Sequence, residues 1–214
     1  TDGALVIGGT TPSLTIGDAG AEDTKIVFDG NAQDFHIGLD DSADDLVIGL
    51  GSSLGTTTHM AFDEAGHVKM PLQSSFFAYP NSTQSNLSTG GHVTIEHNTE
   101  YYDINADFNT GTYTFTAPVT GKYFFSMNMT LSQLDDGGTA YEPLLQTSNR
   151  SYRFLTLDGR LFDTDGVYSF GHAMVVEMDA ADTAHVTFYQ AGGTAQVDHN
   201  GGGTVSWFAG CLLH

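Results

Sequence analysis

The chain has 214 residues, of which 26 are acidic and six are Lys or Arg, giving a formal net charge of −20. A surface this acidic repels phosphate groups, which excludes nucleic acids and anionic membranes as partners and leaves metal ions, cationic groups and neutral glycans. The sequence contains no apolar run long enough to span a bilayer, and its one cysteine, Cys211, lies in an apolar stretch typical of a buried structural thiol.

Residues 1–70 repeat a short apolar pattern. Bulky apolar residues stand at alternate positions, followed by Gly or Asp and a polar turn, in six segments: Leu5–Gly8, Leu14–Gly17, Ile26–Asp29, Phe35–Gly38, Leu46–Gly49 and Met60–Asp63. Alternation of this kind predicts short strands, and its recurrence predicts a stacked array. Since the chain begins at Thr1 within this pattern, we expect it to be part of a longer protein.

A single chain of such strands buries too few side chains to offset the ordering of its backbone, and its open edges invite pairing. Three chains wound about one axis solve both problems, which predicts an intertwined β-repeat shaft and a homotrimer. The segment resembles the shaft repeats of phage tail fibres, and Asp63–Val68 resembles the last turn before a head domain.

An acidic run lies inside the predicted shaft. Asp40, Asp41, Asp44 and Asp45 place four carboxylates within six residues, a density that suits Ca²⁺, the one cofactor that the sequence suggests. The run lacks the glycine and the terminal glutamate of an EF-hand loop, so a solvated turn is the alternative interpretation.

From residue 71 to residue 214 the expected strands are longer and more aromatic. We predict them at Ser74–Tyr79, His92–His97, Tyr101–Asn105, Thr112–Ala117, Lys122–Ser132, Tyr152–Leu157, Tyr168–Met178, His185–Gln190 and Thr204–Leu213. Such strands, separated by polar turns, predict an all-β fold with a jelly-roll β-sandwich head. The predicted domains are therefore the shaft at 1–70 and the head at 71–214.

The head resembles the C1q/TNF-like family. The family's signature residues occur at the expected spacings as Asp103, Phe108, Phe115, Gly121, Tyr123 and Phe125. Two positions depart from the signature, because His97 and Met127 stand where the family has an aromatic residue. The closing segment Ser206–Leu213 resembles the family's final strand.

This resemblance implies a ten-stranded jelly roll that assembles as a tight homotrimer and serves as a recognition module at the end of a stalk. The large rings of Phe108, Phe115, Tyr123 and Phe125 are expected to fill the space between two sheets rather than to bind a ligand.

The chain is not expected to be an enzyme. Its nine histidines form no metal-ligand pair, and the sequence has no nucleophile elbow, Walker loop or dinucleotide fingerprint. A glycan-cleaving tailspike is the less favoured alternative.

Two loops are the predicted recognition surface. Antiparallel strands alternate in direction, so Asp158–Gly166 and Ala191–Gly203 are expected at one end of the sandwich, away from the shaft. The candidate receptor-binding residues in these loops are Arg160, Asp163, Asp165, Gln196, Asp198, His199 and Asn200. In the alternative, the glycines of Ala191–Gly203 merely close a hairpin, and the long loop Asp135–Arg150 with Tyr141, on the trimer flank, becomes the candidate.

These observations indicate that the chain is the distal receptor-binding part of a viral tail fibre. The resemblance of its shaft repeats to those of phage fibres indicates that the virus is a phage. The chain would attach the particle to a host-surface receptor such as a glycan and contact upstream fibre or virion proteins, so the virion and the extracellular space are the expected locations. A cellular secreted or surface C1q-like adhesion protein is the alternative, which the absence of a collagen-like Gly-x-y stalk disfavours.

Overall fold

The computed structural model describes residues 3–162 and 166–214, and the chain divides into two compact units, Thr1–Leu72 and Gln73–His214. Both units are built from antiparallel strands, and the one helical element in the described ranges is the 3₁₀ turn η1 (Gly159–Leu161). Nowhere in those ranges is there a helix with the length and apolarity that crossing a membrane requires.

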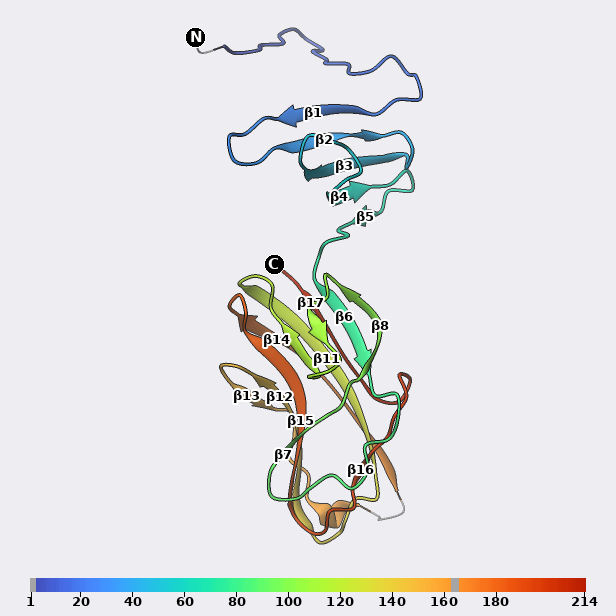
Figure 1. Cartoon of the computed structure of the whole chain (residues 1–214), viewed down its shortest axis with the longest axis vertical. Coiled ribbons are helices and arrows are strands. Elements are labelled where there is room, and N and C mark those ends of the chain that lie inside the picture. Colours follow the sequence, from blue (N-terminus) through green and yellow to red (C-terminus); the bar gives the residue numbers. More distant parts are fainter. Residues whose placement is uncertain (1–2, 163–165) are drawn as a thin grey trace. The chain divides into compact units, whose positions relative to one another are not determined.

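The N-terminal unit is a meander of five strands that pair in sequence order (Figure 1). The strands are β1 (Thr24–Phe28), β2 (Phe35–Asp40), β3 (Asp45–Leu50), β4 (Thr58–Phe62) and β5 (Val68–Lys69). The last four predicted segments coincide with β1 to β4.

The first two predicted strands of this unit are wrong. Residues 3–23 form no strand, and Leu5 and Val6 are each 82% exposed. The alternation of apolar residues is present there, but within the described chain these residues have no partner strand, and a strand needs one to satisfy its backbone hydrogen bonds.

In two of the N-terminal repeats the glycine lies inside a strand rather than in a turn. Gly38 falls within β2 and Gly49 within β3. A Cβ atom on Gly49 would come within 2.5 Å of the Thr57 carbonyl oxygen and 2.6 Å of the His36 ring. The Ile-Gly pairs therefore combine an apolar side chain on one face of the sheet with a missing side chain on the other, where backbone and ring pack closely.

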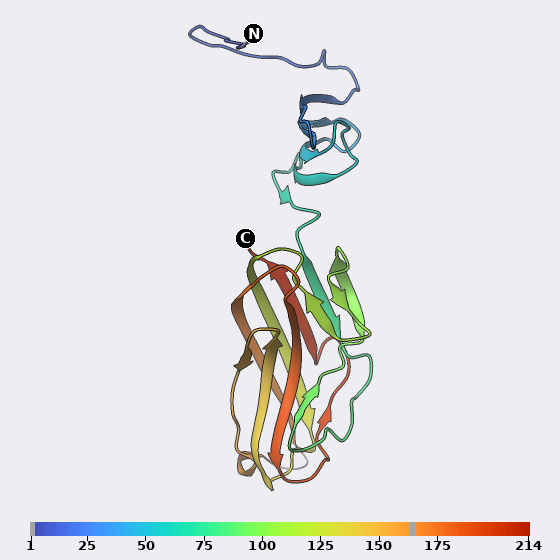
Figure 2. The same cartoon turned by 60° about the vertical axis from the view of Figure 1, so that its left-hand side comes forward.

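The C-terminal unit is a jelly-roll-like sandwich of two sheets that lie face to face (Figure 2). One sheet has the order β13-β12-β15-β10-β9, with β7 also paired to β15, and the other has the order β14-β11-β17-β6-β8, with β16 paired to β11. The strands are β6 (Ser75–Tyr79), β7 (His92–Thr94), β8 (Thr99–Ile104), β9 (Phe108–Asn109), β10 (Thr114–Thr116), β11 (Gly121–Ser132), β12 (Gly138–Thr147), β13 (Ser151–Arg153), β14 (Val167–Met178), β15 (Thr183–Gly192), β16 (Asp198–His199) and β17 (Trp207–Leu212).

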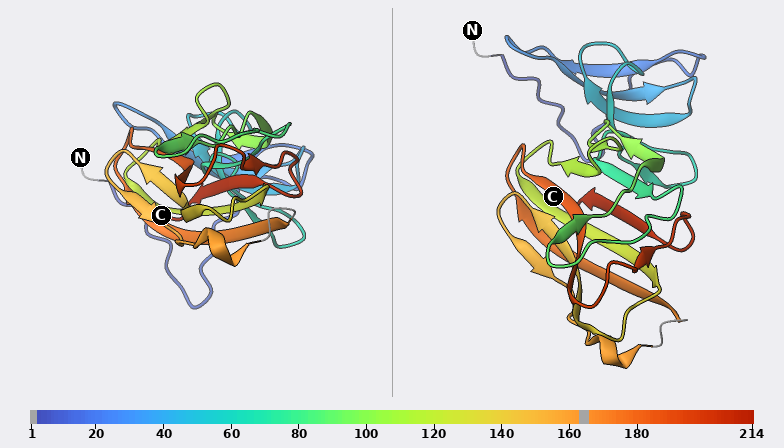
Figure 3. Two further views of the ribbon diagram at one scale, coloured as in Figure 1. Left: turned by 90° about the horizontal axis from the view of Figure 1, so that it is seen from below. Right: turned by 60° about the horizontal axis from the view of Figure 1, so that its bottom comes forward.

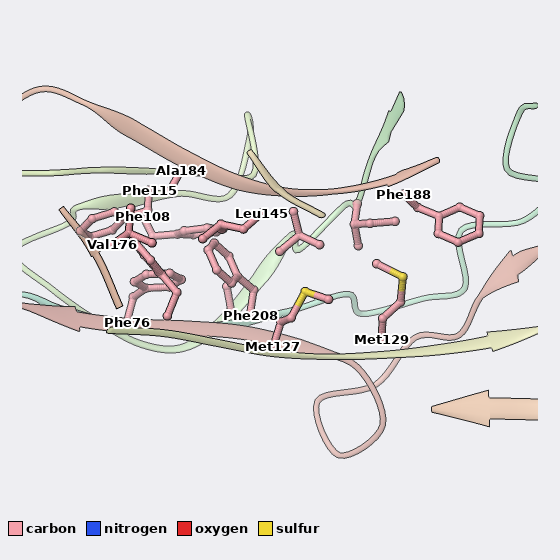
Figure 4. Close-up of a cluster of buried hydrophobic side chains, with 14 of the residues drawn as sticks. Phe76, Phe108, Phe115, Met127, Met129, Leu145, Val176, Ala184, Phe188 and Phe208 are labelled. Atoms are coloured by element: carbon pink, nitrogen blue, oxygen red, sulfur yellow. The ribbon is translucent and has the colours of Figure 1, made fainter. Parts of the chain in front are cut away.

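The core of the sandwich is aromatic and lies between the sheets, as Figure 4 shows. Phe76 of β6 stacks on Phe115 of β10 with ring centroids 5.1 Å apart and meets Phe208 of β17 at 5.0 Å. The predicted core rings are confirmed, since Phe108, Phe115, Tyr123 and Phe125 are all buried.

The predicted loop Asp135–Arg150 is wrong, because β12 runs through most of it and pairs along its length with β15. Its Tyr141 is fully buried and is therefore no surface candidate. Pro143 is tolerated because its backbone faces β13, not β15, and its carbonyl oxygen accepts the Phe154 N–H at 3.1 Å. The missing N–H of Pro143 therefore costs no hydrogen bond to β15.

Candidate functional site

The connections at one end of the sandwich form a tied set of loops, called here the loop end: residues 133–137, 154–162 and 193–197. Asp135 ties the first loop to the third, because its carboxylate accepts the Gly137 N–H at 2.8 Å and both the N–H (2.6 Å) and the hydroxyl (2.8 Å) of Thr194. These hydrogen bonds, first from Gly137 and then from Thr194, lower the pKa of Asp135. Figure 3 shows η1 beside the loops that follow β11 and β15.

Arg160 is exposed at the loop end and is paired with its neighbour Asp158. Its Nε donates to Asp158 Oδ1 at 2.9 Å and its Nη2 donates to Oδ2, while Asp158 also caps η1 through the Arg160 N–H. The hydrogen bonds from Arg160 lower the pKa of Asp158 to about 2. Both residues border a depression of about 350 Å³ with Asp136 and Thr139. The predicted candidates Asp163 and Asp165 lie outside the described residues.

Three of the predicted candidates in Ala191–Gly203 form hydrogen bonds with neighbouring segments of the head. Asp198 accepts the Asn86 N–H at 2.9 Å and the Gln133 side chain at 2.7 Å. Asn200 accepts the Ser132 hydroxyl at 2.8 Å, and Gln196 donates to the Gln133 carbonyl oxygen at 3.1 Å. The segment also contains β16, which pairs with β11. Residues 191–203 are therefore an ordered part of the sandwich rather than a flexible hairpin loop.

His199 does not face solvent. It is fully buried, its ring centroid lies 6.1 Å from that of the buried His97, and His97 in turn lies 5.7 Å from Phe208. Neither ring nitrogen of His199, nor Nδ1 of His97, has a hydrogen-bond partner among the described residues. His199 is therefore a core residue of the monomer and not a surface contact.

Burial shifts the pKa values of both histidines in the same direction. Desolvation lowers the pKa of His199 to about 4. Desolvation, and then the proximity of His199, holds the pKa of His97 well below its usual value. Burial disfavours the charged imidazolium, so both rings are neutral at physiological pH.

The acidic run of the N-terminal unit forms a turn between β2 and β3. Asp40 accepts the Ser42 hydroxyl at 2.7 Å, and Asp45 lies 3.7 Å from the Lys69 ammonium group. Among the described residues no three His, Cys, Asp or Glu side chains are grouped as metal ligands. The structure therefore does not bring Asp40, Asp41, Asp44 and Asp45 together as a ligand set.

The outer face of the sheet β14-β11-β17-β6-β8 carries an aromatic cluster, defined here as Phe77, Tyr79, Tyr101, Tyr102 and Trp207. Tyr101 packs against Phe77 at 5.3 Å and against Tyr79 at 4.6 Å, and Trp207 lies 5.6 Å from Phe77. Tyr101 and Tyr102 remain 59% and 48% exposed. Such a group of exposed rings marks an interaction surface.

The opposite edge of the same outer face carries small residues in the middle of β14. Ser169, Gly171 and Ala173 alternate outward and are exposed, between the exposed Val167 and Val175. The same sheet face therefore has a bulky edge on β6 and β8 and a flatter stretch in the middle of β14. This face was not predicted from the sequence, although Phe77 and Tyr79, and Ser169 and Gly171, stand at alternate positions of their strands and so point to one side of the sheet.

A match to a family model agrees with the architecture of the C-terminal unit. The model of the C1q domain family matches residues 76–213. Among solved structures, the globular domain of zebrafish complement 1qA protein has a TM-score of 0.48 at 18% identity, over 66% of this chain and 98% of that one. Murine APRIL at pH 8.5 has a TM-score of 0.48 at 10% identity, over 66% and 99%. The comparison with curated proteins gives no match. Because the family match spans more than half of the chain, the chain belongs to the C1q domain family.

Proposed function

We propose that the chain is a homotrimeric recognition molecule that binds a surface ligand through its C1q head and catalyses no reaction. C1q domains are generally binding domains that form homotrimers, and proteins that contain them are usually extracellular. The observation that carries the proposal is the outer face of the sheet β14-β11-β17-β6-β8, with its exposed aromatic cluster on one edge and its small residues on the other.

The two edges of this face are complementary in shape. The rings of Tyr101 and Tyr102 protrude, whereas Gly171 and Ala173 leave the backbone of β14 open to close approach. When the bulky edge of one copy packs on the flat stretch of the next, the contact is heterologous, and such contacts close into a ring when the rotation between copies is one third of a turn. A ring of three copies covers every aromatic cluster and matches the family's assembly.

The loop end is the proposed ligand-binding surface. Its backbone is fixed by Asp135, and it presents Arg160, Asp158 and Asp136 around a depression of about 350 Å³. Carboxylates and a guanidinium group pair well with sugar hydroxyls, which favours a glycan as the ligand. A rigid scaffold lowers the entropic cost of binding.

The test compares two exposed arginines at opposite ends of β12: Arg160 at the loop end and Arg150 beyond Thr147. Wild-type protein, Arg160→Ala and Arg150→Ala are applied to an array of immobilised neutral and acidic glycans. Loss of at least tenfold in affinity for Arg160→Ala, with Arg150→Ala unchanged and both melting normally, supports the loop end as the site.

Two outcomes would overturn parts of this proposal. If Arg160→Ala and a second variant, Asp136→Asn, both bind as the wild type does, the loop end is not the binding surface. If the glycans are converted to shorter products rather than retained, the protein is an enzyme and the proposal of a pure binding role fails.

A viral attachment fibre is the second candidate for the same recognition role. The observation that favours it is the N-terminal unit, which is a β-meander with glycine in its strands rather than a collagen-like stalk. In that case the ligand is a host-surface receptor, and upstream fibre proteins are additional partners. Antibody labelling of virus particles and of cell surfaces distinguishes a virion component from a cellular C1q-like adhesion protein.

A further inference from the structure

The five-stranded meander carries most of its large apolar side chains in cross-strand rows on one face, with Val27 and Val47 on the other. One row joins Ile26, Ile37, Ile48 and Met60, a second joins Leu39, Leu46, Phe62 and Val68, and a third joins Phe28, Phe35 and Leu50. These residues are called here the row face. No ionisable side chain interrupts the rows, which is unusual for a sheet face that water covers.

The opposite face of the meander is already covered by its own chain. His36, Val47 and Ala61 on that face are at most 4% exposed. The connection 51–57 lies over them, because His36 Nδ1 bonds to the Gly51 carbonyl oxygen at 2.8 Å and the Leu50 N–H donates to the Thr57 carbonyl oxygen at 2.9 Å. The sheet therefore has one face that is covered by its own chain and one face that is exposed.

The row face is open in the single chain. Phe28 is 60% exposed and Val68 is 55% exposed, and the rows enclose a groove of about 230 Å³ lined by Ile16, Ile26, Leu39 and other residues. An apolar patch of this kind is rare on a protein that works as a monomer and calls for a covering partner.

We propose that the partner is the row face of two further copies of the same chain, so that three meanders pack side by side around a shared apolar interior. This inference rests on the homotrimer of the proposed function, because a trimeric head connected to the meander holds three row faces at high local concentration. The row face is uncharged, whereas the chain as a whole carries a charge of −20, so this face is where copies approach with the least repulsion.

The mode of packing differs from the intertwined shaft expected from the sequence. The strands β1 to β5 pair with one another within a single chain. The copies therefore associate through side chains alone, and no strand is exchanged between chains. Each chain contributes its own row face, formed entirely by its five strands, to the shared apolar interior.

The first test uses two neighbouring residues of β1 that face opposite sides. Ile26 on the row face is 41% exposed and Val27 is 36% exposed, so Ile26→Glu and Val27→Glu add the same charge at similar cost to a single chain. Hydrogen exchange of the β2 and β3 amides is followed in the full chain. We expect at least tenfold faster exchange for Ile26→Glu and little change for Val27→Glu; equal effects of the two variants, or no effect of Ile26→Glu, would overturn the inference.

The second test identifies the partner. In a Cys211→Ser background, Leu39→Cys on the row face and Val27→Cys on the covered face are treated with a short bis-maleimide. Covalent dimers of the chain are expected from Leu39→Cys and not from Val27→Cys. If the particle mass corresponds to three chains but Leu39→Cys gives no dimer, this inference alone fails; if the mass corresponds to one chain, the proposed homotrimer fails first.

Discussion

Phe115 lies at the centre of the aromatic core of the head. It is fully buried, and its ring centroid lies 5.1 Å from Phe76 and 5.5 Å from both Tyr123 and Phe125. Phe115→Ala removes the ring contacts of β10 with the facing sheet and is expected to lower the free energy of unfolding by about 3–5 kcal/mol. Urea denaturation measures this, with Leu161→Ala as the control because Leu161 is 71% exposed. Unchanged stability together with lost ligand binding would show that Phe115 is a site residue instead.

The buried histidines give the head a dependence on pH. Their pKa values are lowered in the folded chain, so the stability they contribute is fully present above the unfolded pKa of about 6.5 and is lost as the pH falls towards about 4. For His199 the difference in pKa corresponds to roughly 3 kcal/mol. No carboxylate is among the causes of either shift, although Glu96 and Asp198 are sequence neighbours of the pair.

We expect His97→Phe to reduce the loss of stability on acidification, because this variant removes one of the two protonation sites. The measurement is the urea midpoint at about pH 7.5 and about pH 5 for the wild type, His97→Phe and the exposed control His92→Ala. If His97→Phe loses as much stability as the wild type over this interval, the buried pair is not the source of the pH dependence.

The strands of the head could be predicted wherever apolar and polar residues alternate over several positions. The long strands β11 and β14 are found nearly to the residue, because buried inward side chains alternate over their length with more exposed outward ones, most of which are polar or small. β12 could not be predicted, since Glu142 and Pro143 interrupt its apolar pattern. Both are accommodated by tertiary contacts, Glu142 by Arg153 at 2.8 Å and by Thr156 at 3.0 Å.

The candidate site was predictable at the level of loops and not of side chains. Strand alternation places Asp158–Phe162 and the segment after β15 at the same end, where Thr194 bonds to the Asp135 carboxylate and Gly159 packs closely against the Asp135 backbone. The sequence could not show that His199 points into the core, because β16 is two residues long and has no periodicity. The sequence also could not show that Asp198 and Asn200 accept hydrogen bonds from other segments of the head, because those bonds join residues far apart in the chain.

At the scale of the loops, Asp135 is the residue that ties the loop end together. Asp135→Ala removes the acceptor for the Gly137 and Thr194 N–H groups. Each of these hydrogen bonds to the carboxylate is expected to contribute at most about 1.5–3 kcal/mol to the local stability of the loop end. Hydrogen exchange of residues 193–197 is expected to accelerate while the β11 and β14 amides stay protected. Uniform acceleration through the whole head would indicate global rather than local unfolding and would contradict this role. The matched control is Asp136→Ala, an exposed neighbour.

At the scale of the whole molecule, two open surfaces of one chain require partners. The outer face of the sheet β14-β11-β17-β6-β8 and the row face belong to different units, and the proposed threefold assembly accounts for both. The net charge of −20 on each chain is expected to keep such trimers apart in solution.

The small residues of β14 permit a direct test of this assembly. Ala173 is exposed in the single chain, so Ala173→Arg leaves the fold of the head intact but blocks the approach of a neighbouring aromatic cluster. Leu161→Arg adds the same charge at an exposed position outside that face. Ala173→Arg is expected to weaken the trimer, whereas Leu161→Arg is not.

The measurement that tests the central claim most directly is the particle mass by sedimentation at micromolar protein and about 0.15 M salt. The account predicts three times the chain mass of 22.8 kDa for the wild type and for Leu161→Arg, and a shift towards the single-chain mass for Ala173→Arg. A folded wild-type species with the mass of one chain would contradict it.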